Sequence, residues 1–268
     1  MRAILLTSTF RRHVFVANTA AARCDLVGVW QEEKSFRPER YAHNSDDEAV
    51  IQRHFAARDD AEAAYFAGDT AVGLGRGAAH RVVPAGACSD SAEVARMSAA
   101  RPDVVLVFGT GILREPLLSA FAGRILNIHL GLSPYYRGAG TNFWPLVSRE
   151  PEYVGATIHY LDAGIDTGPI LSHARPHIDR ADGPHDIGNK TIVAAADSLL
   201  RAAAGHIAGT ARAVPQWSGG RLYQRKDFSA DAVRALYRNF ESGMIDEYLA
   251  SRASRDAALR LIEPERVA

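Results

Sequence analysis

The sequence predicts an α/β protein: a mostly parallel, open, twisted sheet flanked by helices, with a short C-terminal strand and helix extension. Two observations predict this class. Short runs rich in Val, Ile and Leu alternate with longer segments of helical period, an order typical of βαβ units around a parallel sheet. The chain also has 268 residues, 47% hydrophobic and 23% charged, which is an ordinary composition for a domain with a substantial core.

The expected strands are short apolar runs, and the expected helices lie between them. Five strands are expected at residues 3–6, 25–30, 81–83, 103–108 and 125–129. Two more are expected within residues 154–162 and 168–178, joined by a polar loop. Helices are expected at residues 12–22, 48–67, 91–99, 115–121, 141–148 and 184–205.

The pattern changes near residue 210, so we expect two parts. Residues 1–210 form the main domain, and residues 211–268 form the extension. In the extension, a turn and strand with the sequence WSGGRLYQRKDF precede a charged helical tail that starts at Ala230. This tail is a candidate contact for a homodimer.

Charge and hydropathy argue against several classes of protein. The chain has 31 acidic and 31 basic residues and a pI of about 7.2, so no overall field attracts nucleic acid or an anionic membrane. No apolar run approaches the roughly eighteen residues of a membrane span. The opening MRAILLTSTF is too short for a signal peptide, and we expect a cytoplasmic protein. Cys24 and Cys88 lack metal or redox spacing and are expected to be buried.

Three local patterns resemble functional motifs but lack the required context. The run GLGRGA at residues 73–78 matches a loose dinucleotide fingerprint, but an extended segment follows it, so a structural loop is expected. His173 and His177 are interrupted by Pro176, and no acidic or cysteine cluster completes a shell, so no metal is expected. Ser133 lies in a loop without the strained turn of an activated serine.

The segment from residue 102 to 177 contains the residues suited to catalysis. Asn127 and His129 lie two apart in the strand run LNIHL, so their side chains leave the same face. They also lie at the carboxyl end of a parallel strand, where open α/β sheets place ligand crevices. The loop GLSPYYRGAG can bring Arg137 to this crevice, and the loop LDAGIDTG can bring Asp166. In combination these residues predict a polar catalytic centre.

Four motifs, in order and at similar spacing, resemble the formyltransferase family of glycinamide ribonucleotide, methionyl-tRNA and sugar-nucleotide enzymes. They are the N-x-H strand end, the S-P-x-Y-R-G loop, the G-A-T-I-H strand and the D-x-G-x-D-T-G-x-I loop. The resemblance implies a Rossmann-type fold, N10-formyltetrahydrofolate as formyl donor, no metal, and Asn127, His129 and Asp166 as catalytic residues. The implied folate pocket contains Gly109, Thr110, Gly111, Ile112, Leu113, Asp162, Ala163, Gly164 and Ile165.

These residue types suit the transfer of a formyl group to an amine. Attack of a neutral amine on the formyl carbon creates an oxyanion, to which the Asn127 amide can donate. His129 can stabilise the same oxygen when protonated, or relay a proton, and Asp166 beside it favours the charged imidazole. Asp166 can also take the amine proton through water.

Departures from the family narrow the expected acceptor. Leu130 stands where many members have proline, which alters the loop facing the acceptor. The run TSTFRRH replaces the glycine-serine phosphate loop of the glycinamide ribonucleotide enzymes, and about forty residues follow Asp227, fewer than the RNA-binding domain of the tRNA enzymes. We therefore expect a small-molecule amine rather than nucleic acid, and favour an amino sugar attached to a nucleotide. An amino acid or hydroxylamine is the alternative.

The candidate acceptor contacts are Arg11, Arg12, His13, Tyr135, Arg137 and Trp144, each of which is equally well explained as a solvated charge or a packing aromatic. Residues 31–69 form either a decorated crossover helix or part of an acceptor pocket. Two other functions are hydrolysis of the formyl donor and non-catalytic folate binding. The family's hydrolases carry an N-terminal regulatory domain, and a binding module need not retain all three catalytic residues.

Overall fold

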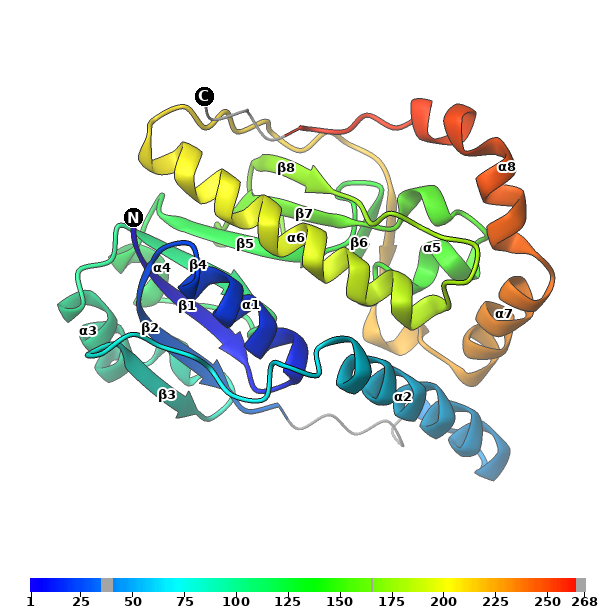
Figure 1. Cartoon of the computed structure of the whole chain (residues 1–268), viewed down its shortest axis with the longest axis horizontal. Coiled ribbons are helices and arrows are strands. Elements are labelled where there is room, and N and C mark those ends of the chain that lie inside the picture. Colours follow the sequence, from blue (N-terminus) through cyan, green and yellow to red (C-terminus); the bar gives the residue numbers. More distant parts are fainter. Residues whose placement is uncertain (35–40, 165, 264–268) are drawn as a thin grey trace.

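The computed structural model describes residues 1–34, 41–164 and 166–263, and Figure 1 shows their arrangement. A seven-stranded sheet has the order β3-β2-β1-β4-β5-β7-β8. Its strands are β1 (Arg2–Ser8), β2 (Asp25–Glu32), β3 (Ala79–Val83), β4 (Val104–Phe108), β5 (Ile125–Leu130), β7 (Ala156–Tyr160) and β8 (Ile170–Ala174). The helices are α1 (Arg11–Ala21), α2 (Ser45–Tyr65), α3 (Ser91–Ala99), α4 (Leu117–Ala120), α5 (Phe143–Val147), α6 (Pro184–Ile207), α7 (Ala230–Glu241) and α8 (Met244–Ala257).

The mostly parallel sheet expected from the sequence is confirmed. Strands β3, β2, β1, β4 and β5 pair in parallel, whereas β7 is antiparallel to β5 and β8 is antiparallel to β7. One expected helix is much shorter than predicted, because α4 starts only after Pro116. The sequence also gave no sign of β6 (Tyr136–Gly138), which pairs in parallel with β9 (Arg221–Tyr223) in a separate two-stranded sheet.

Side-chain alternation along the inner strands creates an apolar layer on each face of the sheet. Leu5 belongs to the layer that contains Ala17 of α1 and Leu199 of α6, the helices drawn in front of the sheet in Figure 1. Leu6 belongs to the opposite layer, with Met97 of α3. Burial on both faces explains why the inner strands are continuous apolar runs.

The extension shares a core with the rest of the chain. Leu236 of α7 and Tyr248 of α8 are 1% exposed and belong to a third apolar cluster, together with Leu146 of α5 and Ile187 of α6. The division at residue 210 and the homodimer through this tail stay predictions. Of the two cysteines expected to be buried, Cys88 is buried and Cys24 is only partly buried.

The last described residues cover the outer edge of β8. His173 N donates to Ile262 O at 2.7 Å, and Ile262 N donates to His173 Nδ1 at 3.0 Å. Ile170 and Val214 exchange two backbone hydrogen bonds of 2.8 Å on the same edge. The β8 edge of the sheet is therefore paired by the extension, which protects this edge from the addition of another strand.

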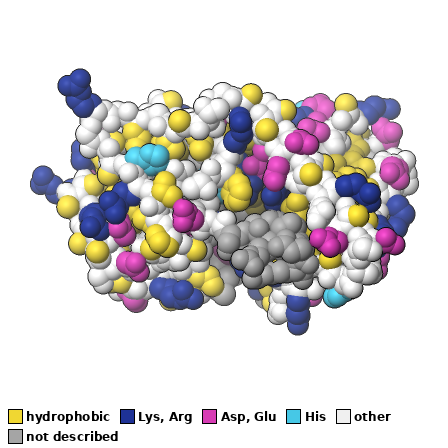
Figure 2. All heavy atoms as spheres, turned by 90° about the horizontal axis from the view of Figure 1, so that it is seen from below, with side chains coloured by type: hydrophobic (Ala, Val, Ile, Leu, Met, Phe, Trp, Pro, Cys, Tyr) yellow, Lys and Arg dark blue, Asp and Glu magenta, His cyan; other side chains and the backbone are white. Residues whose placement is uncertain are grey.

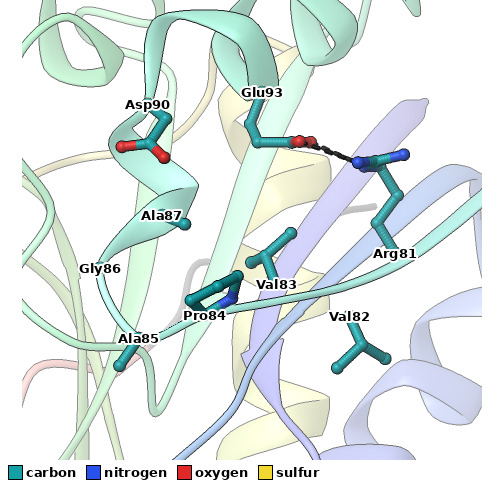
Figure 3. Close-up of a pocket in the computed structure, with 9 residues that line it drawn as sticks. All are labelled: Arg81, Val82, Val83, Pro84, Ala85, Gly86, Ala87, Asp90 and Glu93. Atoms are coloured by element: carbon teal, nitrogen blue, oxygen red, sulfur yellow. Dashed lines mark hydrogen bonds and ion pairs between the residues drawn. The ribbon is translucent and has the colours of Figure 1, made fainter.

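A carboxylate joins α3 to the sheet, and we expect its loss to be destabilising. Glu93 accepts from Trp30 Nε1 at 2.8 Å. It also accepts from Arg81 Nε and Nη2 at 2.7 and 2.9 Å, the pair joined by a dashed line in Figure 3. Glu93→Ala would leave the buried indole N–H without an acceptor, so urea denaturation should show a loss of about 3 kcal/mol in unfolding free energy.

The control for this prediction is Asp90→Ala at the N-cap of the same helix. The Asp90 side chain makes no capping hydrogen bond, so the variant should change the unfolding free energy by less than about 0.5 kcal/mol. Equal losses in the two variants would contradict the role assigned to Glu93.

Candidate functional site

The polar centre of the molecule lies on β5, where the sheet changes from parallel to antiparallel pairing. Asn127 stands opposite His159 of β7, and His129 stands opposite Thr157. Asn127 and His129 are each 8% exposed, and His159 is 1% exposed. The spacing of two residues along β5 puts Asn127 and His129 on one face, as predicted, and the register of β7 adds His159 beside them.

Asp166 completes this centre from the loop between β7 and β8. Its Oδ2 lies 3.3 Å from His129 Nδ1, and its Oδ1 lies 3.7 Å from His159 Nε2. Asn127 Nδ2 donates to His159 Nε2 at 3.0 Å. His159 Nδ1 donates to the Tyr160 carbonyl oxygen at 2.9 Å, which leaves Nε2 free to accept from Asn127. His159 therefore orients the amide of Asn127.

The environment keeps Asp166 ionised. Burial raises the pKa of the Asp166 carboxyl, but the hydrogen bond from His129 and the nearby His159 ring outweigh it and hold the pKa well below its usual range. The carboxylate favours a proton on His129 Nδ1, so Nε2 faces the other way, with Thr141 Oγ1 at 3.4 Å. Thr141 Oγ1 itself donates to the Leu130 carbonyl oxygen. His129 is thus oriented by Asp166 on the Nδ1 side of its ring.

A glutamine of the extension holds the loop that carries Asp166. Gln216 Nε2 donates to the carbonyl oxygens of Asp166 and Gly168 at 2.7 and 2.9 Å. Asp166 has a φ of 52°, which is uncommon outside glycine. A Cβ on Gly168 would lie 1.7 Å from the Tyr160 carbonyl oxygen, so the chain needs glycine there. Gln216 stabilises this constrained loop.

We expect Gln216→Ala to lower kcat by about tenfold, because the carboxylate loop loses two hydrogen bonds and Asp166 is held less closely to His129. The loss in unfolding free energy should be only about 1–2 kcal/mol. Initial rates and urea denaturation measure the two quantities. Gln52→Ala on the exposed face of α2 is the control, since Gln52 bonds only to Glu48. A destabilised variant with an unchanged kcat would contradict this role.

Two buried side chains, Glu32 and Thr7, bind the backbone at the predicted folate loop of residues 109–113 and at the strand end before it. Gly111 N donates to Glu32 Oε2 at 2.7 Å, and Glu32 is 1% exposed at the end of β2. Thr7 Oγ1 donates to the Phe108 carbonyl oxygen at 2.8 Å where β4 ends. These contacts fix the backbone of a loop that lines the same cavity as the predicted catalytic residues.

The second predicted folate loop, residues 162–166, is closed by its own side chains. Asp162 Oδ1 accepts from Gly164 N at 3.1 Å and from Thr167 Oγ1 at 2.9 Å. Ala163 is exposed on this loop, and Ile165 lies outside the described residues.

One cavity of about 820 Å³ brings most of the predicted site residues together. The predicted catalytic and folate residues that line it are Asn127, His129, Asp166, Gly109, Thr110, Gly111, Ile112, Leu113, Asp162 and Gly164. Of the candidate acceptor contacts, Arg12, His13 and Trp144 line it as well. The volume lies within the range of small-molecule sites in enzymes.

Four predicted site residues are not part of the cavity lining. They are Arg11, Tyr135, Arg137 and Ala163. The Tyr135 hydroxyl accepts from Arg260 N at 2.7 Å, and its ring lies 5.7 Å from that of Trp217, so it packs against the extension. Arg137 lies on β6.

Sequence reasoning missed a wall of the cavity that several segments build. Its members are Lys34, Tyr41, His54, Phe55, Arg58, Glu62, Phe143, His185, Asn189, Arg225 and Phe228. Of the two interpretations of residues 31–69, the crossover helix is present as α2, between β2 and β3. The side chains of α2 line the cavity, and their part in an acceptor pocket stays a prediction. Residues 35–40 of that segment lie outside the described residues. Helical periodicity cannot indicate which face of α2 meets a cavity, because distant segments form the opposite wall.

Two histidines of this wall share one hydroxyl. His54 Nδ1 lies 3.2 Å and His185 Nε2 lies 3.3 Å from the Tyr237 hydroxyl, and the two imidazole centroids are 4.9 Å apart. Burial, with His185 and Arg58 nearby, lowers the pKa of His54 to about 3. Burial, with Arg58 nearby, lowers the pKa of His185 to about 4. Both rings are therefore neutral at neutral pH, and the positive charge of this wall comes from Arg and Lys.

The other patterns that resembled motifs do not gather into a site. Residues 73–78 form a loop that leads into β3. His173 Nε2 lies 2.9 Å from the Ser133 carbonyl oxygen, whereas His177 is exposed and lies 3.2 Å from Asp179. In the described part of the chain, no group of three or more His, Cys, Asp or Glu residues could hold a metal ion.

A second, shallower hollow of about 500 Å³ lies along β3 and the start of α3 (Figure 3). Of its two carboxylates, Asp90 and Glu93, the second is already engaged by Arg81 and Trp30. No helix within the described residues is long and apolar enough to cross a membrane. Figure 2 shows acidic and basic side chains interspersed over the face seen from below.

Comparison with known sequences points to one family. Residues 28–203 match the family model described as formyl transferase. A methionyl-tRNA formyltransferase from Solibacter usitatus is 35% identical over 154 residues, which cover 58% of this chain and 45% of that protein. One from Clavibacter sepedonicus is 37% identical over 130 residues, covering 47% and 42%. The chain thus spans less than half the length of these curated relatives.

Solved structures show the same fold at low sequence identity. A sugar N-formyltransferase from Shewanella sp FDAARGOS_354 has a TM-score of 0.54 and 18% identity, covering 85% of this chain and 78% of that one. A phosphoribosylglycinamide formyltransferase from Anaplasma phagocytophilum also has a TM-score of 0.54, with 16% identity, covering 84% and 98%.

Proposed function

The chain belongs to the formyl transferase family, and from that premise we propose that it moves a formyl group from N10-formyltetrahydrofolate to an amine of a small molecule. The arrangement of Asn127, His129 and Asp166 carries the proposal. The three side chains lie on one cavity with the two loops that the family resemblance assigns to folate.

The geometry supports a stepwise transfer. Attack of the amine places negative charge on the formyl oxygen, and a fixed N–H donor near that oxygen lowers the barrier. The Asn127 amide has two N–H groups, of which His159 accepts one, so the other is available to that oxygen. His129, with Nδ1 directed to Asp166, offers Nε2 to move the proton from the amine toward the departing carrier nitrogen.

As the acceptor we propose an amino sugar attached to a nucleotide. The cavity wall combines aromatic rings with cations, and such an acceptor contains a flat base and a negatively charged linkage. Trp144, Phe143 and Phe228 supply rings, while Arg12 supplies charge. An amino acid or hydroxylamine is the smaller alternative and uses less of this wall.

A methionyl-tRNA acceptor is the second candidate. It is supported by the two relatives named above, which are methionyl-tRNA formyltransferases. The near-equal numbers of acidic and basic side chains are a weak match to a polyanionic acceptor, since phosphate contacts from Lys and Arg dominate nucleic-acid affinity.

The test is formyl release from N10-formyltetrahydrofolate, followed spectroscopically with a panel of acceptors and an acceptor-free control. The panel contains amino-sugar nucleotides, amino acids, hydroxylamines and methionyl-tRNA. Release that depends on an amino-sugar nucleotide supports the proposal, and release with methionyl-tRNA alone replaces it with the second candidate. Release without acceptor indicates a hydrolase. Folate binding without release indicates a non-catalytic module.

A further inference from the structure

Four cations line the cavity, and one of them, Arg58 of α2, pairs with Asp59. The other three come from separate segments. Arg12 lies in the first turn of α1, Lys34 follows β2, and Arg225 follows β9. Glu62 of α2 binds Arg12 in a nearly buried ion pair, with side chains 8% and 16% exposed respectively. Within the described residues, neither Lys34 nor Arg225 has an ion-pair partner. Among the described side chains, two positive charges of this group therefore have no opposite charge in direct contact.

The start of α1 adds to this positive region. Its N-cap residue, Phe10, makes no side-chain capping bond, and the first turn contains no acidic residue. The positive end of a helix dipole normally favours acidic residues, yet Arg11 and Arg12 occupy this turn. His13, next along the helix, is 1% exposed, lines the cavity, and has no hydrogen-bond partner on Nδ1 among the described atoms. A helix start of this kind is suited to an anion.

The charge state of Lys34 agrees with this geometry. Desolvation in the cavity and the charge of Arg12, with a contribution from Arg225, lower the pKa of the Lys34 ammonium to about 8, although Glu32 acts in the opposite direction. Arg12 and Arg225 therefore repel the charged form of Lys34. An anion placed among them would remove this repulsion.

We propose that Arg12, Lys34 and Arg225 form a subsite that binds the phosphate groups of the acceptor. The two charges of Lys34 and Arg225 match a phosphate ester or a diphosphate better than a single carboxylate, which would leave one charge in excess. A guanidinium also binds two phosphate oxygens at once. The assignment deepens the proposed function and rests on it for the identity of the acceptor.

Phe228, three residues after Arg225, lines the same cavity and lies 5.5 Å from the ring of Phe55, centroid to centroid. A nucleoside joined to the bound phosphates therefore has aromatic faces within reach. The cationic subsite and the aromatic wall together select an acceptor that carries phosphate next to a flat ring.

The test uses inorganic pyrophosphate as the probe, titrated into the whole chain by calorimetry at low salt without folate. Lys34→Gln and Arg225→Gln should each weaken its binding about tenfold, because each removes one charge-assisted contact. Arg12 is left unchanged, since its loss would leave Glu62 nearly buried without a partner. Lys226→Gln is the matched control: it removes the neighbouring charge, which does not line the cavity.

The proposal is overturned if the unaltered chain shows no saturable pyrophosphate binding, or if Lys226→Gln weakens it equally. It is also overturned if the two variants lose affinity for 5-formyltetrahydrofolate instead, which would assign the cations to the donor's carboxylates. Far-UV circular dichroism verifies that each variant is folded.

Failure of the proposed function has a different signature. If pyrophosphate binds through Lys34 and Arg225 but no amine in the panel is formylated, the result supports the subsite and contradicts the transferase proposal. If an amino-sugar nucleotide is formylated with the same KM by the unaltered chain and by both variants, the result supports the transferase and contradicts the subsite.

Discussion

His129→Gln should lower kcat for formyl transfer by about 1000-fold, with little change in KM for the donor. The imidazole is the group placed to move a proton and to stabilise the formyl oxygen, and losses of that size follow when either role is removed. Glutamine retains hydrogen bonding and approximate size, so the binding of folate should persist. Initial rates at saturating donor and acceptor measure the effect.

The control for this prediction is His80→Gln. His80 lies on the edge strand β3, where its Nε2 is 2.7 Å from Gln31 Oε1, and it does not line the cavity. Its replacement should leave kcat within about twofold. A loss of less than tenfold in His129→Gln would contradict the catalytic role of His129.

Asp166→Asn should lower kcat by about 100-fold or more, because the neutral amide no longer gives His129 Nδ1 the carboxylate contact that orients the imidazole. The same variant should also change the pH dependence of stability. The pKa of the Asp166 carboxyl in the folded chain lies below its ordinary value of 3.8. Ionised Asp166 therefore contributes stability that is fully present above pH 3.8 and is lost as the pH falls through the folded value.

Urea denaturation from pH 3 to pH 7 measures this second effect. The unfolding free energy of the unaltered chain should exceed that of Asp166→Asn most at neutral pH, and the difference should shrink in acid. Asp60→Asn on the exposed side of α2 should show no such pH-dependent difference. A difference that grows as the pH falls would contradict the ion pairing described for Asp166.

The elements predicted correctly from sequence are those with a local cause. β5 is an apolar run because both faces of the sheet are buried there, and its two polar residues, Asn127 and His129, lie on one face. The helix at residues 91–99 has its expected bounds. The strand expected in WSGGRLYQRKDF is present as β9. By contrast, its partner β6 contains three residues and exists because it pairs with β9 across a long stretch of chain, which local propensity cannot reveal.

The same distinction explains what was predicted of the site. Asn127, His129 and Asp166 belong to recognisable motifs, and the structure brings them together. His159 lies in the G-A-T-I-H motif, but its contact with Asn127 depends on the antiparallel register of β7, which the sequence does not specify. Gln216 carries no motif signal, because it bonds only to backbone carbonyl groups of a distant loop.

The dependence of the Asp166 loop on Gln216 has a consequence for the order of synthesis. A ribosome completes the seven strands of the sheet once Ala174 has been added, and by then Asn127, His129 and Asp166 are all present. Gln216 is added some forty residues later, and Arg225 and Phe228 follow it. A nascent chain can therefore assemble the seven-stranded sheet before its carboxylate loop is held in place, and this loop reaches its final geometry only after Gln216 has been added.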